Sequence, residues 1–64
     1  MNSEARRSMR IQQLTAMALR GAKLEELEAL ARKWASPPVA QDYIENMQSN
    51  VRKIYEKRRL RVRK

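Results

Sequence analysis

Positive charge is concentrated at one end of this 64-residue chain. Residues 52–64 read RKIYEKRRLRVRK, with eight Lys or Arg against the single Glu56, a local charge of +7, whereas residues 1–51 sum to only +1. Clustered cations bind dense negative charge, most often the phosphates of nucleic acid. The candidate phosphate contacts are Arg52, Lys53, Lys57, Arg58, Arg59, Arg61, Arg63 and Lys64, with Arg6, Arg7 and Arg10 as secondary candidates.

Other interpretations of the basic cluster make specific demands on the sequence. A solvated helix end is complemented by two or three cations, which interact favourably with the helix dipole, but six of the last eight residues here are basic. An anionic membrane or an acidic protein would also be attracted. A helix lying on a membrane is expected to interleave Trp, Phe or Leu with its cations, and only Tyr55, Leu60 and Val62 are present, which argues against lipid.

The composition offers little for catalysis or for metal binding. The chain has no His and no Cys, so its serines have no imidazole base and a zinc site lacks its usual ligands. A single Gly excludes a Gly-rich phosphate loop. No apolar run approaches the ~20 residues of a membrane span, and no signal-peptide pattern is present. The sequence therefore predicts a cytoplasmic protein that is not an enzyme and has no cofactor.

Three helical patterns cover nearly all of the chain. Apolar residues recur at spacings of three and four, and the only Gly and the two Pro fall between the patterns, where they are expected to end helices. Leu60 to Arg63 alternate between apolar and basic, which fits an extended arm as well as a fraying helix end. We predict an all-α three-helix bundle with a long third helix, the helices spanning about 4–19, 23–35 and 38–59, in a domain of residues 1–56 followed by a basic C-terminal tail of residues 57–64.

Residues 24–44, LEELEALARKWASPPVAQDYI, resemble helix-turn-helix DNA-binding domains. The resemblance rests on a Leu-Glu-Glu-Leu helix with a small residue at Ala31, a short turn and a following apolar helix. It departs from the family in the turn, which has Pro37-Pro38 where Gly is usual. The resemblance implies a recognition helix in which Gln41 and Asn46 read base edges, because amides pair bidentately with adenine. A plain three-helix bundle explains the same pattern.

The third pattern also carries a stripe with the alternating spacing of a coiled coil. Part of this stripe extends beyond what the shorter helices can cover, and a 64-residue domain without disulfides is a candidate for self-association. A homodimer seam and an intramolecular core are both compatible with the spacing. The candidate seam residues are Ile44, Met47, Val51 and Ile54.

Together these features favour a small nucleic-acid-binding protein, with DNA preferred to RNA, associated with transcription or replication and acting as a homodimer. The alternative is a small helical adaptor that docks on a larger protein or ribonucleoprotein assembly. The first is expected to bind duplex DNA alone and with strong salt dependence, whereas an adaptor is expected to need its partner.

Overall fold

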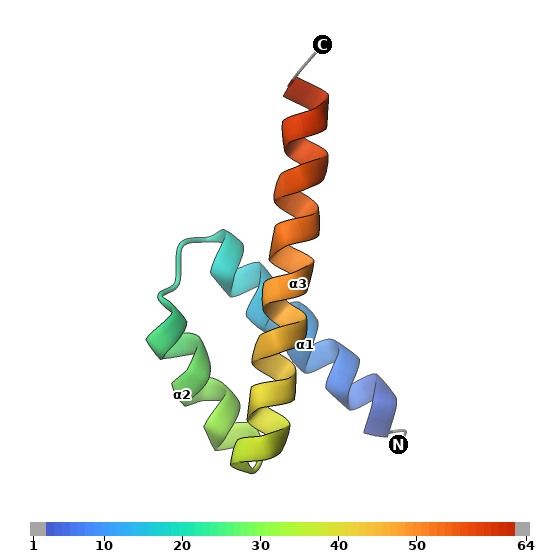
Figure 1. Ribbon diagram of the computed structural model, residues 1–64. Helices are drawn as coiled ribbons and strands as arrows, with labels where there is room; N and C mark the ends of the chain where they lie inside the picture. The colour runs from blue at the N-terminus through green and yellow to red at the C-terminus, as the bar shows by residue number, and fades with distance from the viewer. Residues whose placement is uncertain (1–2, 63–64) are drawn as a thin grey trace.

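The computed structural model describes residues 3–62, with side chains described as far as Arg59, and it confirms the predicted all-α three-helix architecture. Figure 1 shows the three helices. Their bounds are α1 Ser3–Leu19, α2 Leu24–Trp34 and α3 Pro37–Val62. The third helix runs beyond the expected end at residue 59, so the alternating residues Leu60 to Val62 continue the helix instead of forming an extended arm.

Local sequence signals explain the end of α1 and the start of α3. Gly21 has a φ of 103°, and the amides of Gly21 and Ala22 donate to the carbonyls of Ala18 and Met17 at 3.0 and 3.1 Å. This pair of hydrogen bonds is the Schellman motif, which needs a left-handed residue directly after the helix. At the start of α3, Pro37 needs no backbone donor, and the first helical hydrogen bond runs from Ala40 to the Ser36 carbonyl at 2.8 Å.

The core is built from the stripes that the sequence indicated. Each helix contributes buried apolar residues, and α3 packs against both α1 and α2. The buried set is Ile11, Leu14, Leu27, Ala31, Ala40, Tyr43, Ile44 and Met47. The single buried polar residue among those described is Thr15, whose hydroxyl donates to the Ile11 carbonyl at 2.7 Å and is therefore satisfied.

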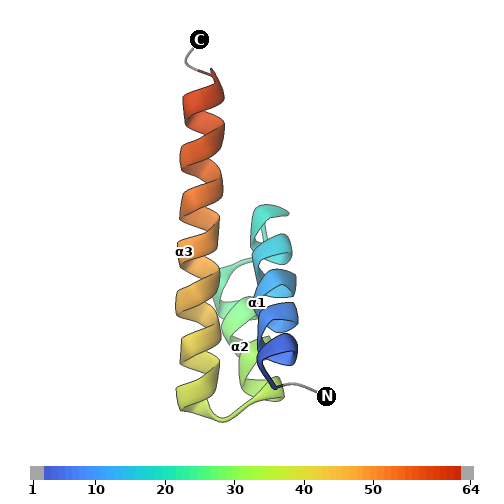
Figure 2. The same ribbon diagram turned by 90° about the vertical axis from the view of Figure 1, so that its right-hand side faces the viewer.

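The last half of α3 projects beyond the bundle. At about 1.5 Å per residue, α3 is roughly 39 Å long, whereas α1 is roughly 26 Å and α2 roughly 17 Å. Val51 is the last residue of α3 that packs against the core. We call residues 52–62 the overhang, and Figures 1 and 2 show it standing clear of the other two helices. The described part of the basic cluster thus lies on a helical projection.

Candidate nucleic-acid interface

The overhang presents its cations to solvent. The side chains of Arg52, Lys53, Lys57, Arg58 and Arg59 are all exposed, and none of them makes a hydrogen bond or ion pair to another described residue. Arg61 lies in α3 beyond the last described side chain, and Arg63 and Lys64 lie outside the described residues. Because the five described cations have no carboxylate partner to give up, binding a phosphate breaks no existing pair.

These cations surround the helix axis. At 3.6 residues per turn, successive side chains are about 100° apart. Arg52 and Arg59 therefore lie on one side of α3, Lys53 and Lys57 lie about 130° around the axis from them, and Arg58 lies on the line that the core residues follow lower in the helix. A helix with this arrangement presents a cation to a phosphate that approaches from any side.

Arg7 is occupied at the other end of the molecule. Its Nε donates to Oδ2 of Asp42 at 2.8 Å and its Nη2 to Oδ1 at 3.2 Å, which joins α1 to the start of α3. The hydrogen bond from the Arg7 guanidinium holds the pKa of the Asp42 carboxyl below its ordinary value, although partial desolvation opposes this. The negative charge of Asp42 is therefore balanced by a partner within the chain.

Arg10 joins the three helices. Its guanidinium lies 5.7 Å from the ring centroid of Trp34 and 6.0 Å from that of Tyr43. The Nη1 nitrogen donates to the Trp34 carbonyl and to the Tyr43 hydroxyl, each at 3.3 Å. The Trp34 carbonyl is one of those left unpaired at the end of α2, where a cation is favourable. Arg10 is thus half-buried in a structural joint.

The secondary candidates do not join the overhang. Arg6 is exposed, but it lies in the first turns of α1 beside Arg7. Figure 2 shows that the N-terminal end of α1 lies near the start of α3, at the opposite end from the overhang. The structure therefore separates the two groups of basic residues that the sequence analysis grouped together as phosphate contacts.

Gln41 and Asn46 also lie away from the overhang. Gln41 is exposed, and its Nε2 donates to Glu45 at 3.2 Å. Asn46 is half-buried, and its Nδ2 donates to the Asp42 carbonyl at 2.8 Å and to Oδ1 at 3.0 Å. Asn46 thus buttresses the carboxylate that binds Arg7. To contact a base edge, the Asn46 side chain would first have to break these hydrogen bonds.

The stripe expected to form a dimer seam divides into two parts. Ile44 and Met47 are buried by the chain's own helices, so their surface is already covered. Val51 and Ile54 remain half-buried. Of the two uses that the spacing allowed, the intramolecular core accounts for the first pair. Val51 packs against the edge of this core, and Ile54 lies beyond it.

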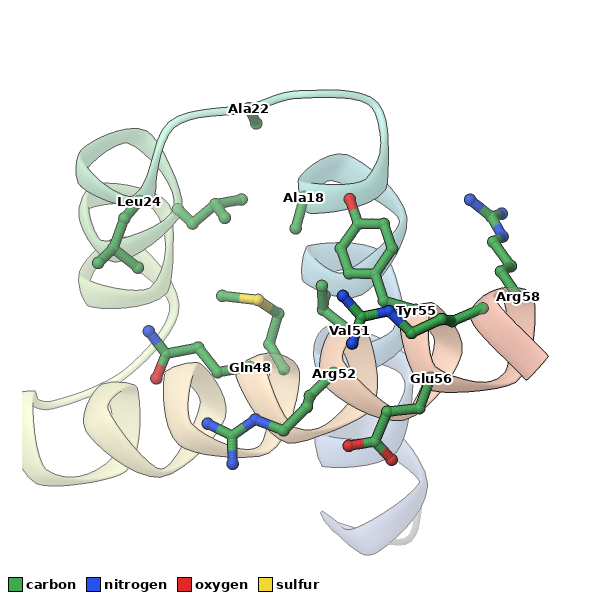
Figure 3. A pocket seen from close by; sticks show the side chains of 12 residues that line it. Ala18, Ala22, Leu24, Gln48, Val51, Arg52, Tyr55, Glu56 and Arg58 are labelled. Carbon is green, nitrogen blue, oxygen red and sulfur yellow. The ribbon is translucent and has the colours of Figure 1, made fainter. Parts of the chain in front are cut away.

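A groove beside the overhang was not anticipated. It has a volume of about 1020 Å³ and lies between the end of α1, the start of α2 and the second half of α3. Figure 3 shows Leu24 on one wall and Tyr55 on the other. Both Leu24 and Tyr55 are among the exposed large apolar residues. Their exposure follows from the unequal helix lengths.

We expect the Arg7–Asp42 ion pair to contribute stability in a pH-dependent way. Because the pKa of Asp42 is lowered in the folded state, its contribution is present above the unfolded pKa of about 3.9 and is lost as pH falls through the folded pKa. The melting temperature of the wild type should exceed that of Asp42→Asn near pH 6. The difference should shrink as thermal melts are repeated toward pH 2.

Glu45→Gln is the control for this experiment, since Glu45 is an exposed carboxylate on the same helix that bonds only to Gln41 among the described residues. A gap between wild type and Asp42→Asn that stays constant from pH 6 to pH 2 would contradict the assignment.

No protein-family model matches the chain, and comparisons with curated proteins and with solved structures also give no match. Within residues 3–62, none of the helices carries an apolar stretch of the length that a bilayer crossing requires.

Proposed function

We propose that the chain binds nucleic acid through its phosphates, with the overhang as the contacting element. The observation that carries this proposal is the set of five exposed, unpaired cations distributed around a projecting helix. Neutralising phosphates releases condensed counterions, which supplies affinity without demanding a particular sequence. Arg61, Arg63 and Lys64 extend the same charge along the chain.

The dimensions favour duplex DNA. An α-helix with its side chains is about 10–12 Å across, and the major groove of B-form DNA is about 12 Å wide, so a free helix can enter it with phosphates on both sides. Cations in three groups, each about a third of a turn from the next around the overhang, suit that position. The major groove of A-form RNA is deep and narrow and does not admit such an element.

The same features predict weak sequence preference. The two amides to which the resemblance assigns base recognition, Gln41 and Asn46, lie in the first half of α3. Along the helix axis, Asn46 is about 18 Å from Arg58. Residues 52–59 contain no Asn or Gln. We propose that contacts to the backbone dominate, since phosphate contacts position a protein without reading sequence. A role in transcription or replication is compatible with this mode of binding.

The test is a salt titration. Fluorescence anisotropy of a labelled 20-base-pair DNA duplex is measured between 50 and 200 mM salt, beside duplex RNA and single-stranded DNA. If about five to seven phosphates are neutralised, log K should fall against log salt with a slope of about −4.5 to −6. DNA duplexes of unrelated sequence should bind equally, and duplex RNA more weakly.

A slope shallower than about −2 would mean that fewer than about three phosphates are contacted, and the proposal would then be wrong. Binding to a selected duplex at least a hundredfold tighter than to random duplexes would instead support the recognition-helix interpretation that the resemblance implies.

A further inference from the structure

The groove beside the overhang is apolar at its base and flanked by charge on one side. Leu27 and Met47 form a buried floor, and Val51 is half-buried above them. Leu24, at the start of α2, is 45% exposed, and Tyr55, on α3, is 52% exposed. Figure 3 shows these two side chains on opposite walls, with Ala18 of α1 between them at the back. An apolar ligand would therefore be contacted from both sides.

The groove lies where a fourth helix would pack. The end of α1 and the start of α2 both lie beside the middle of α3, and α3 continues past them without a neighbour among the described residues. The overhang spans about 16 Å, the length of three helical turns. An amphipathic helix of that length, set alongside α3, would cover Leu24, Val51 and Tyr55 and complete a four-helix arrangement, as helix-in-groove partners do.

Charge decides which occupant fits. The charged residues that line the groove are Arg52, Glu56, Arg58 and Arg59, all on α3, which leaves that wall with a net charge of +2. A second copy of the chain would bring its own overhang, part of a segment of charge +7, against this wall. Like charges brought together in an interface are unfavourable. The complementary partner has acidic side chains on the flank that faces α3.

We propose that the groove binds an amphipathic helix of another protein, with an apolar stripe on Leu24, Val51 and Tyr55 and acidic residues toward Arg58 and Arg59. The flank of the partner helix that faces the start of α2 should carry no acidic residues, because the exposed Glu25 and Glu26 would repel them. The inference does not depend on nucleic-acid binding, since it rests on the groove and its charged wall.

The probe is a synthetic, fluorescein-labelled 18-residue helix with a leucine stripe, glutamates on one flank and glutamines on the other. A scrambled peptide of the same composition, without an apolar face, measures simple charge attraction. Peptide binding is followed by anisotropy, in the absence of nucleic acid. We expect the patterned peptide to bind at least tenfold more tightly than the scrambled one, and a patterned peptide with lysine in place of glutamate to bind at least tenfold more weakly.

Matched variants locate the binding. The variant Leu24→Ala/Tyr55→Ala should bind the patterned peptide at least tenfold more weakly than wild type. The control Met9→Ala/Val39→Ala truncates two exposed apolar residues outside the groove, and its affinity for the peptide should change less than twofold. Circular dichroism melts establish that both variants fold, as expected for exposed positions. These results would hold whether or not the salt titration with DNA succeeds.

Two results would overturn the proposal. Equal affinities for the patterned and scrambled peptides would show that the cations attract acidic peptides by charge alone and that the groove makes no contribution. A concentration-dependent dimer in sedimentation equilibrium at tens of micromolar, weakened by Leu24→Ala/Tyr55→Ala, would assign the groove to a second copy. We expect a monomer.

Discussion

Deleting residues 57–64 is expected to lower the affinity for duplex DNA at least a hundredfold near 0.1 M salt while the bundle stays folded. The deletion removes six of the eight cations of residues 52–64. Each lost phosphate contact should reduce the salt slope by about 1, and several together account for the fall in affinity. Lys57, Arg58 and Arg59 are exposed, so helix content should fall only by the deleted turns and the melting temperature should hardly change.

Substitutions can distinguish the effect of where the positive charges lie from the effect of the total net charge. Lys57→Gln/Arg58→Gln/Arg59→Gln keeps the full length of α3 and removes three charges. Arg20→Gln/Arg32→Gln/Lys33→Gln removes the same number from exposed positions of the bundle. Anisotropy titrations with the same duplex should show at least a tenfold loss for the first variant and less than threefold for the second. Equal losses would mean that net charge matters and the overhang does not.

Replacing Leu14 with alanine is expected to remove most of the stability of the fold. The Leu14 side chain has no exposed surface, and alanine there leaves a cavity where α1 meets the other helices. Such changes cost about 2.7–5 kcal/mol. A domain of this length has a total free energy of unfolding of roughly 3–10 kcal/mol. Urea unfolding at 25 °C should therefore show the variant unfolding at a much lower urea concentration than wild type.

Met9→Ala is the matched control, since Met9 is on the same helix and is 69% exposed. Its free energy of unfolding should lie within about 0.5 kcal/mol of wild type. If Leu14→Ala costs less than 1 kcal/mol under the same conditions, the packing of α1 against the other helices is not the main source of stability.

Local rules were sufficient to predict most of the fold. The bounds of the helices follow from Gly21, from the two prolines and from apolar spacing, each of which acts over a few residues. The end of α3 was less predictable, because the alternation from Leu60 onward fits two conformations. Once a helix is formed, adding a residue gains a hydrogen bond without a new nucleation cost, and α3 therefore continues to Val62.

The contacts that distinguish the two ends of the molecule could not be predicted from the sequence. Arg7 and Asp42 are 35 residues apart, and the Arg10 joint to Trp34 and Tyr43 spans 24 and 33 residues. No short-range spacing marks such pairs, so Arg7 and Arg10 were predicted to contact phosphate. The groove was missed for the same reason, since it depends on where α1 and α2 stop relative to α3.

The continuity of α3 has a consequence for how long its amide protons survive in deuterated water. Between Ala40 and Met47 one face of the helix is buried in the core, and the amides there are expected to exchange only when the whole domain opens. Beyond Val51 the same helix is held by its own hydrogen bonds alone, so its amides exchange through fraying that leaves the bundle intact. One helix thus has a gradient of protection along its length. A bound macromolecule would slow exchange beyond Val51 first, and the affected amides would trace its contact with the chain.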